Sequence, residues 1–587
     1  MIKLYESGNQ NVKPNVIIFT QVIDAWAKST HRIAARKAQA VFDRMEVLAT
    51  TTDDFNLYPN TITYNALLNA WANSDDPDAA TQALSILNEM EELNKNNNGE
   101  NKNNRNVKPD ARSMNSVMLC LAKSNGGVGS SAQKAENLLQ EMITMYKDGN
   151  SNVSPDSFSF VTVINAWVLS GAMESETKIL YILDLMKELH KSNVIRFEPN
   201  AIIFNTVIKF FLGNGDISKA DEILHQMEQS YLSGNTAAKP DQKTYTAILH
   251  LCASRGLARK AIDILDRMND MYNSGNNAAK VNTICYNMAM TSLARSNERG
   301  TAQRAQNILE DMKATYEKTG DIDLKPDALS YSTCIDAWSK SGEKESAKRA
   351  IILLREMEEQ HKDLGIKPTR VAYNAVLNAL SKTRTMAAAQ KAETLLERME
   401  TLHSGGDKLY EDVSPDAISY TSVINSWAGI RVKGAAERAE QVLWHMEDLY
   451  EAGNIDVKPD RVTFNTVLKS WSKSAEESAP KRAEELLRRM YELYKNNRDD
   501  IKPDGYSVTQ VLLAYANALG VQGSAWKAQN FLDQMEEEYA KGDESMKPAL
   551  ACYTAVVNAW EQSGEKESKQ KIEELTKRVS SLYKARK

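Results

Sequence analysis

The sequence is poor in the features that mark disulfide-rich, zinc-binding and membrane-spanning proteins. It has five cysteines among 587 residues, and no two of them form a CxxC pair. A disulfide framework or a zinc site needs clustered cysteines, so we interpret these residues as small buried side chains in a reduced compartment. No run of about 18 apolar residues occurs, which predicts no membrane span. The cysteines are Cys120, Cys252, Cys285, Cys334 and Cys552.

Motifs that carry enzyme chemistry are also missing. The single HxE motif, at His445, is not followed by the PCxxC pair of a zinc deaminase. The HExxH, P-loop and glycine-rich nucleotide-binding patterns do not occur. We therefore expect no enzyme activity, no metal and no cofactor. The formal net charge of −6 does not favour a general polyanion binder.

What the sequence does contain is a repeated pair of helical patterns, seen most clearly at residues 461–504. Each pattern places four apolar residues at i, i+3, i+4 and i+7, which puts them on one face of a helix. Neither stripe can be covered within the pair, so the unit needs neighbours on both sides. The first stripe is Phe464, Val467, Leu468 and Trp471, and the second is Ala483, Leu486, Leu487 and Met490.

The same pair returns in thirteen units spaced 41–50 residues apart, most of them closed by Pro-Asp or Pro-Asn. Tryptophan fills the eleventh position in seven of these units. Stacked repeats of this kind share one continuous core. We therefore predict an all-α fold, a right-handed superhelical α-solenoid of tandem helix-turn-helix repeats, with about 26 helices and the first helices on its inner face. The units begin at Val16, Thr61, Ala111, Ser157, Ala201, Gln242, Thr283, Ala328, Arg370, Ala417, Arg461, Gly505 and Leu550.

This register divides the chain into three parts. Residues 1–15 match residues 446–460 position by position, so the chain is expected to begin within the second helix of a partial repeat. Residues 16–549 form twelve tandem units. Residues 550–587 form a thirteenth unit, whose second helix is polar and ends in a basic tail, as is typical of a terminal cap.

The phrases VTFNTVLKSWSKS, ISYTSVINSWAGI and VKPD resemble the pentatricopeptide repeat family, and the resemblance covers residues 1–587. The shared features are an aromatic residue at the fourth position, a small polar residue at the fifth, paired aliphatic residues and the Pro-Asp ending. The units are longer than is usual in the family. We expect the added residues between the two helices and at the end of the second helix, where they extend that helix and the loop after it.

The resemblance implies a non-catalytic protein that binds single-stranded RNA selectively and acts in RNA metabolism, through transcript stabilisation, processing or translation. It also implies a monomer, with other RNA-processing proteins as further partners. The location it implies is a mitochondrion or a plastid, although no targeting peptide is visible in the chain. The acidic net charge and the lengthened helices favour a second hypothesis, a protein–protein interaction scaffold built on the same solenoid.

In this family each repeat reads one RNA base with two or three side chains, and the resemblance assigns that role to the fifth and last positions. The fifth position is Asn, Thr or Ser in twelve of thirteen units and never Lys or Glu, which a merely solvated helix face would admit. An Asp or Asn at the last position is also a good N-cap for the next helix, so capping alone remains an alternative there. The expected base-reading residues are Thr20, Asn60, Asn65, Asp110, Asn115, Asp156, Asn205, Asp241, Thr246, Asn282, Asn287, Asp327, Asn374, Asp416, Thr421, Asp460, Asn465 and Asp504.

The family's pairing preferences imply the RNA target 5′-AUU?UAU?UGU?-3′. In this scheme Thr with Asn reads adenine, Thr with Asp reads guanine, and Asn with Asp reads uracil. The unassigned bases face the units that depart from the pattern at Val161, Ser332 and Ala549. Second positions are mostly apolar and suited to stacking on a base, although Arg112 and Lys243 break the pattern. The apolar ones include Ile17, Ile62, Ile202, Ile284, Val371, Ile418 and Val462.

Six of the thirteenth positions are basic and none is acidic, which predicts a positive line that holds RNA phosphates. A row of solvated lysines would give the same pattern, so that alternative remains open. The expected phosphate-contacting residues are Lys28, Lys123, Arg295, Lys340, Lys382 and Lys473.

Overall fold

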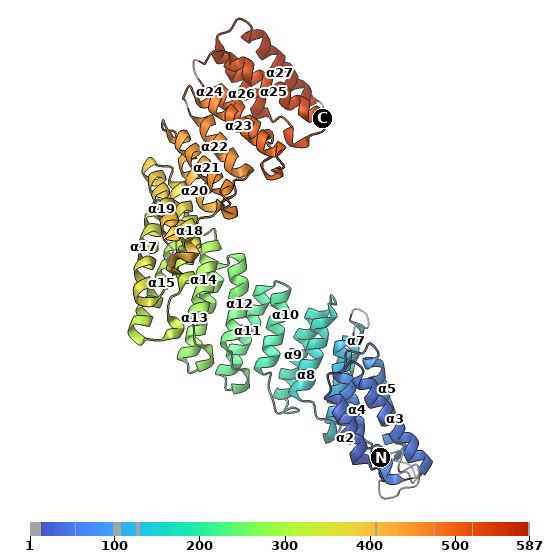
Figure 1. Cartoon of the computed structure of the whole chain (residues 1–587). Helices are drawn as coiled ribbons and strands as arrows, with labels where there is room; N and C mark the ends of the chain where they lie inside the picture. Colours follow the sequence, from blue (N-terminus) through green and yellow to red (C-terminus); the bar gives the residue numbers. More distant parts are fainter. Residues whose placement is uncertain are drawn as a thin grey trace. The chain divides into compact units, whose positions relative to one another are not determined.

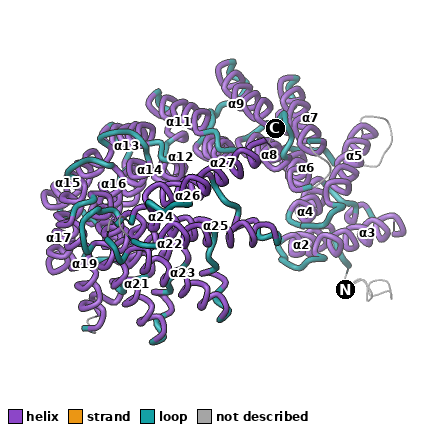
Figure 2. Tube along the Cα trace, turned by 90° about the horizontal axis from the view of Figure 1, so that it is seen from above, coloured by secondary structure: helices purple, strands orange, loops and turns teal. Residues whose placement is uncertain are grey.

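The computed structural model describes residues 13–52, 54–97, 107–124, 129–405, 408–474, 476–518 and 521–584. In these residues the chain forms 26 α-helices, labelled α2 to α27, joined by loops and short 3₁₀ helices and with no strand (Figure 2). The predicted all-α fold of tandem helical pairs is confirmed. None of these helices is long and apolar enough to cross a membrane. The helix end expected in residues 1–12 lies outside the described part of the chain.

The first helix of each repeat begins at the residue that the sequence register predicts. In most repeats proline ends the preceding segment, and the residue after it caps the new helix. These helices have 12 to 14 residues. They are α2 (Val16–Ala27), α4 (Thr61–Ala72), α6 (Ala111–Lys123), α8 (Ser157–Ser170), α10 (Ala201–Gly213), α12 (Gln242–Arg255), α14 (Thr283–Arg295), α16 (Ala328–Ser341), α18 (Arg370–Thr383), α20 (Ala417–Ala428), α22 (Arg461–Lys473), α24 (Gly505–Asn517) and α26 (Leu550–Ser563).

The second helices are longer, with 16 to 19 residues. Part of the added length of each repeat therefore lies in the second helix, as the sequence register predicts. The second helices are α3 (Ala34–Thr52), α5 (Ala79–Asn97), α7 (Ser130–Lys147), α9 (Ser175–Lys191), α11 (Ile217–Leu232), α13 (Ala258–Asn273), α15 (Thr301–Thr319), α17 (Ser346–Leu364), α19 (Met386–Ser404), α21 (Ala435–Glu451), α23 (Ala479–Lys495), α25 (Ser524–Ala540) and α27 (Ser568–Lys584).

The rest of the added length forms a short 3₁₀ helix after most second helices. In two repeats the asparagine before it ties this turn to the previous repeat. Asn235 Nδ2 donates to the Pro199 carbonyl at 2.9 Å, and Asn276 Nδ2 donates to the Pro240 carbonyl at 2.8 Å. An ordered link therefore joins each of these two repeats to the one before it. The 3₁₀ helices are η2 (Phe55–Leu57), η3 (Ser151–Val153), η4 (Thr236–Ala238), η5 (Asn277–Ala279), η6 (Ile322–Leu324), η7 (Lys408–Val413), η8 (Ile455–Val457), η9 (Asp499–Ile501) and η10 (Glu544–Met546).

Asn276→Ala is expected to lower the free energy of unfolding by about 1–3 kcal/mol. The side chain is buried, and its loss leaves the Pro240 carbonyl and the Ala278 N–H without their partner. Urea unfolding followed by circular dichroism measures the change. The control is Asn454→Ala, because Asn454 occupies the same place in its repeat but is exposed and accepts the Asp456 N–H. An equal loss in both variants would contradict a special role for the Asn276 link.

The helix pairs are grouped in two compact units. One contains residues 1–251 with 266–280, and the other contains residues 252–265 with 281–587. Within each unit successive first helices pack on one another and each second helix packs on its own first helix, as Figure 1 shows for α8 to α11 and for α20 to α23. The expected superhelical winding stays a prediction.

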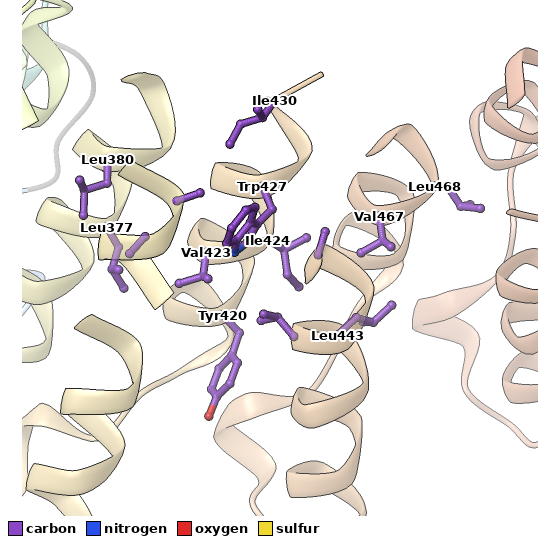
Figure 3. Close-up of a cluster of buried hydrophobic side chains, with 14 of the residues drawn as sticks. Leu377, Leu380, Tyr420, Val423, Ile424, Trp427, Ile430, Leu443, Val467 and Leu468 are labelled. Atoms are coloured by element: carbon purple, nitrogen blue, oxygen red, sulfur yellow. The ribbon is translucent and has the colours of Figure 1, made fainter. Parts of the chain in front are cut away.

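Aromatic side chains form the core between neighbouring first helices. In Figure 3, Tyr420 and Trp427 of α20 lie among buried residues of the adjoining helices, including Leu377 of α18 and Val467 of α22. Full burial of one large apolar side chain stabilises the fold by about 1.5–3 kcal/mol. This packing fixes the first helices side by side, and so it also fixes the spacing of the polar positions on their other face.

Candidate nucleic-acid interface

The last residue of each repeat caps the first helix of the next one. Asp110 Oδ1 accepts the N–H groups of Arg112 and Ser113 at 2.9 and 3.0 Å, and Ser113 Oγ accepts the Asp110 N–H at 3.2 Å. This reciprocal arrangement is a capping box. The N-cap role expected of aspartate and asparagine is confirmed for Asn60, Asp110, Asp156, Asn200, Asp241, Asn282, Asp327, Asp416, Asp460 and Asp504. Thr369 caps α18 in the same way.

Four of the six fifth-position asparagines form hydrogen bonds to these capping residues where one repeat joins the next. Asn65 Nδ2 lies 3.1 Å from each carboxylate oxygen of Asp110. The structure therefore brings together the two predicted base-reading residues of one repeat. The same Nδ2–Oδ1 bond is 3.2 Å for Asn115 and Asp156, 3.0 Å for Asn287 and Asp327, and 3.0 Å for Asn374 and Asp416.

Other predicted pairs are not hydrogen-bonded to each other in the described part of the chain. In the described residues no hydrogen bond joins Thr20 to Asn60 or Thr421 to Asp460, and none joins the pairs Asn205–Asp241 and Asn465–Asp504. The side chains of such a pair are held by other partners, which the sequence register could not identify.

The fifth-position hydroxyls are held mainly by their own helices. Five of them donate to the carbonyl four residues earlier, at 2.5 to 3.0 Å. A hydroxyl has one proton, so such a residue presents only oxygen lone pairs to a ligand. The sixth, Thr20, lies 2.8 Å from Thr63 Oγ1 instead. The five bonds run from Thr246 to Gln242, from Ser332 to Ala328, from Thr421 to Ala417, from Thr509 to Gly505 and from Thr554 to Leu550.

Most fifth-position side chains are half-buried, and Asn115 and Asn287 are only 8% and 4% exposed. This burial disfavours a merely solvated face. The second-position side chains beside them are, by contrast, exposed apolar groups, with 46–68% of their surface accessible in ten repeats. Three of the ten, Phe158, Leu329 and Tyr506, were missed in the sequence although they occupy the same register position. The ten are Ile17, Ile62, Phe158, Ile202, Ile284, Leu329, Val371, Ile418, Val462 and Tyr506.

One groove in the first unit brings the second, fifth and last positions together. It has a volume of about 550 Å³ and runs over α2, α4, α6 and α8. Its walls are therefore both apolar and hydrogen-bonding. The lining residues include Thr20, Ile62, Asn65, Asp110, Asn115 and Phe158.

The thirteenth-position residues have a structural role that the sequence did not reveal. Lys123 Nζ donates to the Ala72 carbonyl at 2.7 Å, and Lys382 Nζ donates to the Ser339 carbonyl at 2.7 Å. Each of these bonds caps the C-terminal end of the preceding first helix. Asparagine also occurs at this position and donates to the same kind of carbonyl. Its occurrence among the lysines was the sequence signal for a capping role. The further bonds run from Asn73 to Ala27, from Arg295 to Ala253 and from Asn517 to Ser472.

The other three predicted phosphate contacts are placed differently. Lys28 and Lys340 each form an ion pair with the aspartate four residues earlier, at 2.6 Å. The Lys473 ammonium is partly buried, and this burial, together with the nearby cations Lys469 and Arg384, lowers its pKa. No cluster of three or more potential metal ligands is present in the described ranges.

Two family models match the chain. The pentatricopeptide repeat domain model matches residues 4–74 and 308–383, and the PPR repeat model matches residues 202–232 and 243–272. A search of curated proteins finds no match. Among solved structures, the chain is similar to the pentatricopeptide repeat protein PPR10 in complex with an 18-nt psaJ RNA element, and to a cysteine-to-serine variant of that protein with the same RNA. In each case the identity is 20% and the TM-score is 0.35, over 98% of this chain and 71% of the other.

The matched segments fall on the helical pairs described above. They cover all or part of the first, the second and the fifth to ninth repeats. The remaining repeats share the same register, and all of them except the third bury an aromatic residue at the fourth or eleventh position. The chain therefore contains repeats of the pentatricopeptide type.

Proposed function

We propose that the chain binds single-stranded RNA along its first helices, one base per repeat, and acts in RNA metabolism without catalysis. The observation that carries this proposal is the row of exposed apolar second positions beside half-buried polar fifth positions. A base has an apolar face that stacks on side chains and a polar edge that forms hydrogen bonds. Apolar and polar side chains alternate on this surface in the way that base recognition requires.

An Asn–Asp pair offers a base one donor and one acceptor. Asn374 Nδ2 carries two protons, and it donates a hydrogen bond to the Asp416 carboxylate through one of them. The second proton can donate to a base, and the Asp416 carboxylate retains lone pairs that can accept from it. Uracil carries a carbonyl oxygen next to its N3–H, so this pair favours uracil, in agreement with the family's preferences.

A fifth-position hydroxyl offers the opposite polarity. Thr421 donates its proton to its own helix at 2.7 Å, so its oxygen can only accept from a base. Adenine carries an N6 amino group, and guanine carries N1–H and N2 amino groups. An acceptor at the fifth position suits these purine donors, and the choice of purines at threonine repeats and uracil at asparagine repeats follows the family's preferences.

Phosphate binding is assigned to the cations at the thirteenth position. A lysine ammonium has three protons, so Lys123 and Lys382 retain donors beyond the one that caps a helix. Neutralising several phosphates gives binding that weakens as the salt concentration rises. We expect that dependence here despite the net charge of −6.

The finer role is part of the same proposal. A chain that covers a dozen nucleotides would protect them and present the flanking RNA to other RNA-processing proteins. We propose transcript stabilisation, processing or translation in a mitochondrion or plastid, with the chain acting as a monomer.

The direct test is fluorescence anisotropy with the RNA 5′-AUUUUAUUUGUU-3′ and a scrambled RNA of the same composition, at two salt concentrations. The unaltered chain is expected to prefer the first RNA by at least tenfold, because each matched base contributes about 1–3 kcal/mol of discrimination. The double substitution Asn374→Thr with Asn465→Thr is expected to reduce that affinity by about 10- to 100-fold.

A compensating RNA provides the control. With guanine at the ninth and eleventh nucleotides, the double variant is expected to regain affinity while the unaltered chain loses it. Equal, salt-sensitive binding to all RNAs would leave only an electrostatic surface. The absence of binding at both salt concentrations would refute the proposal and favour the protein-scaffold hypothesis.

A further inference from the structure

The six fifth-position asparagines share a contact that the sequence did not predict. Each accepts, at Oδ1, a hydrogen bond from the hydroxyl of the third residue in the next first helix. The distances are 2.6 Å from Ser113 to Asn65, 2.7 Å from Ser159 to Asn115, 2.8 Å from Thr244 to Asn205, 2.7 Å from Ser330 to Asn287, 2.6 Å from Ser419 to Asn374, and 2.7 Å from Ser507 to Asn465.

The backbone sets the direction of the protons along this contact. The Asp504 N–H, which can only donate, reaches Ser507 Oγ at 3.2 Å. The hydroxyl therefore keeps its own proton, and two oxygens can accept it: Asn465 Oδ1 at 2.7 Å and Asp504 Oδ1 at 2.9 Å. The shorter of the two contacts favours the asparagine. The distance of 2.7 Å to Asn465 Oδ1 is typical of an O–H···O bond and short for an N–H···O bond. The asparagine oxygen is thus held by the protein, and Nδ2 is the atom left for a ligand.

We propose that these third-position hydroxyls are positioning residues for base reading. By holding the asparagine oxygen, each hydroxyl makes the amide offer N–H rather than C=O to the base. This orientation selects a base with an acceptor at that place, such as uracil. The inference rests on the RNA-binding function proposed above and extends it to residues outside the fifth and last positions. They are Ser113, Ser159, Thr244, Ser330, Ser419 and Ser507.

The repeats differ in how much the amide depends on the hydroxyl. Asn374 is held on both sides, by Ser419 at 2.6 Å and by Asp416 at 3.0 Å. Asn465 has the Ser507 bond at 2.7 Å, and no other side-chain hydrogen bond to it is present in the described structure. The orientation of Asn465 is therefore more sensitive to loss of its hydroxyl partner.

The test replaces Ser507 by alanine in the full chain and uses four RNAs that differ only at the eleventh nucleotide, which faces Asn465. In the unaltered chain, anisotropy titrations are expected to show a preference for uracil of about tenfold. In Ser507→Ala the amide can turn over and offer its oxygen, so the preference is expected to fall to about twofold. Ser507→Thr retains a hydroxyl and is expected to restore the preference, since Thr244 makes the same contact with Asn205.

Two matched variants separate positioning from helix capping. Ser419→Ala removes the hydroxyl beside Asn374 but leaves the Asp416 bond, so the uracil preference at the ninth nucleotide is expected to fall only about threefold. Thr463→Ala also removes a third-position hydroxyl, which lies 3.3 Å from Thr421 Oγ1. Thr421 carries no amide to orient, and its proton goes to its own helix at 2.7 Å. The base preference at the tenth nucleotide is expected to remain. Thermal unfolding shows whether each variant is folded.

The outcomes are distinguishable. An unchanged uracil preference in folded, RNA-binding Ser507→Ala would overturn the positioning role and leave the proposed function intact. An equal loss of preference in Thr463→Ala would also overturn it, since loss of capping would explain both results. If the unaltered chain binds no RNA or shows no base preference, the proposed function itself fails, and the positioning role fails with it.

Discussion

Arg267→Leu is expected to lower the free energy of unfolding by about 3–5 kcal/mol. Arg267, on α13, donates to Glu228 of α11 through Nε at 3.0 Å and Nη2 at 2.6 Å, and to Asp221 through Nη1 at 2.5 Å. Glu228 is 4% exposed and also accepts the Tyr245 hydroxyl at 2.8 Å. Leucine would leave this carboxylate buried without its counter-charge. Burial, with the Glu228 charge nearby, already raises the pKa of Tyr245.

Urea unfolding followed by far-UV circular dichroism measures this loss. The control is Arg259→Leu on the same helix, because Arg259 is 82% exposed where it pairs with Glu298, and its loss is expected to cost less than about 0.5 kcal/mol. Adding Glu228→Gln to Arg267→Leu removes the unpaired charge and is expected to recover most of the stability. A change below about 1 kcal/mol in Arg267→Leu would show that the buried pair is not a stabilising link.

The second large effect concerns RNA affinity without a change in stability. Replacing Ile202, Ile418 and Val462 by serine is expected to weaken RNA binding about 100-fold, because each base loses about 1 kcal/mol of stacking. These side chains are 61–64% exposed in the free protein, so their loss removes little of the core. Anisotropy titrations measure the affinity, and thermal unfolding is expected to show the same midpoint as the unaltered chain.

A matched triple variant tests whether position or apolarity matters. Val47, Ile322 and Ile455 are 56–78% exposed but lie outside the second positions. Their replacement by serine is expected to leave RNA affinity within about twofold of the unaltered value. Equal weakening in the two triple variants would contradict stacking at the second position and point to general hydrophobic attraction.

The helix pairs could be predicted because their signals are local. A Pro-Asp ending stops one helix and caps the next within a few residues, so all thirteen starts agree with the register. The residues at the second and fifth positions could be identified by counting from these helix starts. The structure adds that the polar fifth positions are mostly half-buried, whereas the apolar second positions are exposed.

What could not be predicted depends on neighbouring repeats. The sequence does not show that Lys123 reaches the Ala72 carbonyl, because that atom lies 51 residues earlier. It also does not show which tryptophans find an acceptor. Trp471 Nε1 donates to Glu440 at 2.9 Å, whereas Trp427 Nε1 is buried and has no hydrogen-bond partner among the described residues. These contacts depend on the exact approach of packed helices, which residue periodicity does not determine.

The contact from each third-position hydroxyl to the preceding asparagine has a consequence for exchanging repeats between proteins of this kind. An excised segment that starts at Arg370 and stops at Asp416 would carry Asn374 and leave Ser419 behind. A chimera cut between repeats would therefore inherit an asparagine without its hydroxyl unless the acceptor chain supplies one. A cut between the third and fourth residues of successive first helices keeps each such contact within one transplanted cassette. The natural boundary for recombination is then inside a helix, three residues after the loop where the repeat visibly ends.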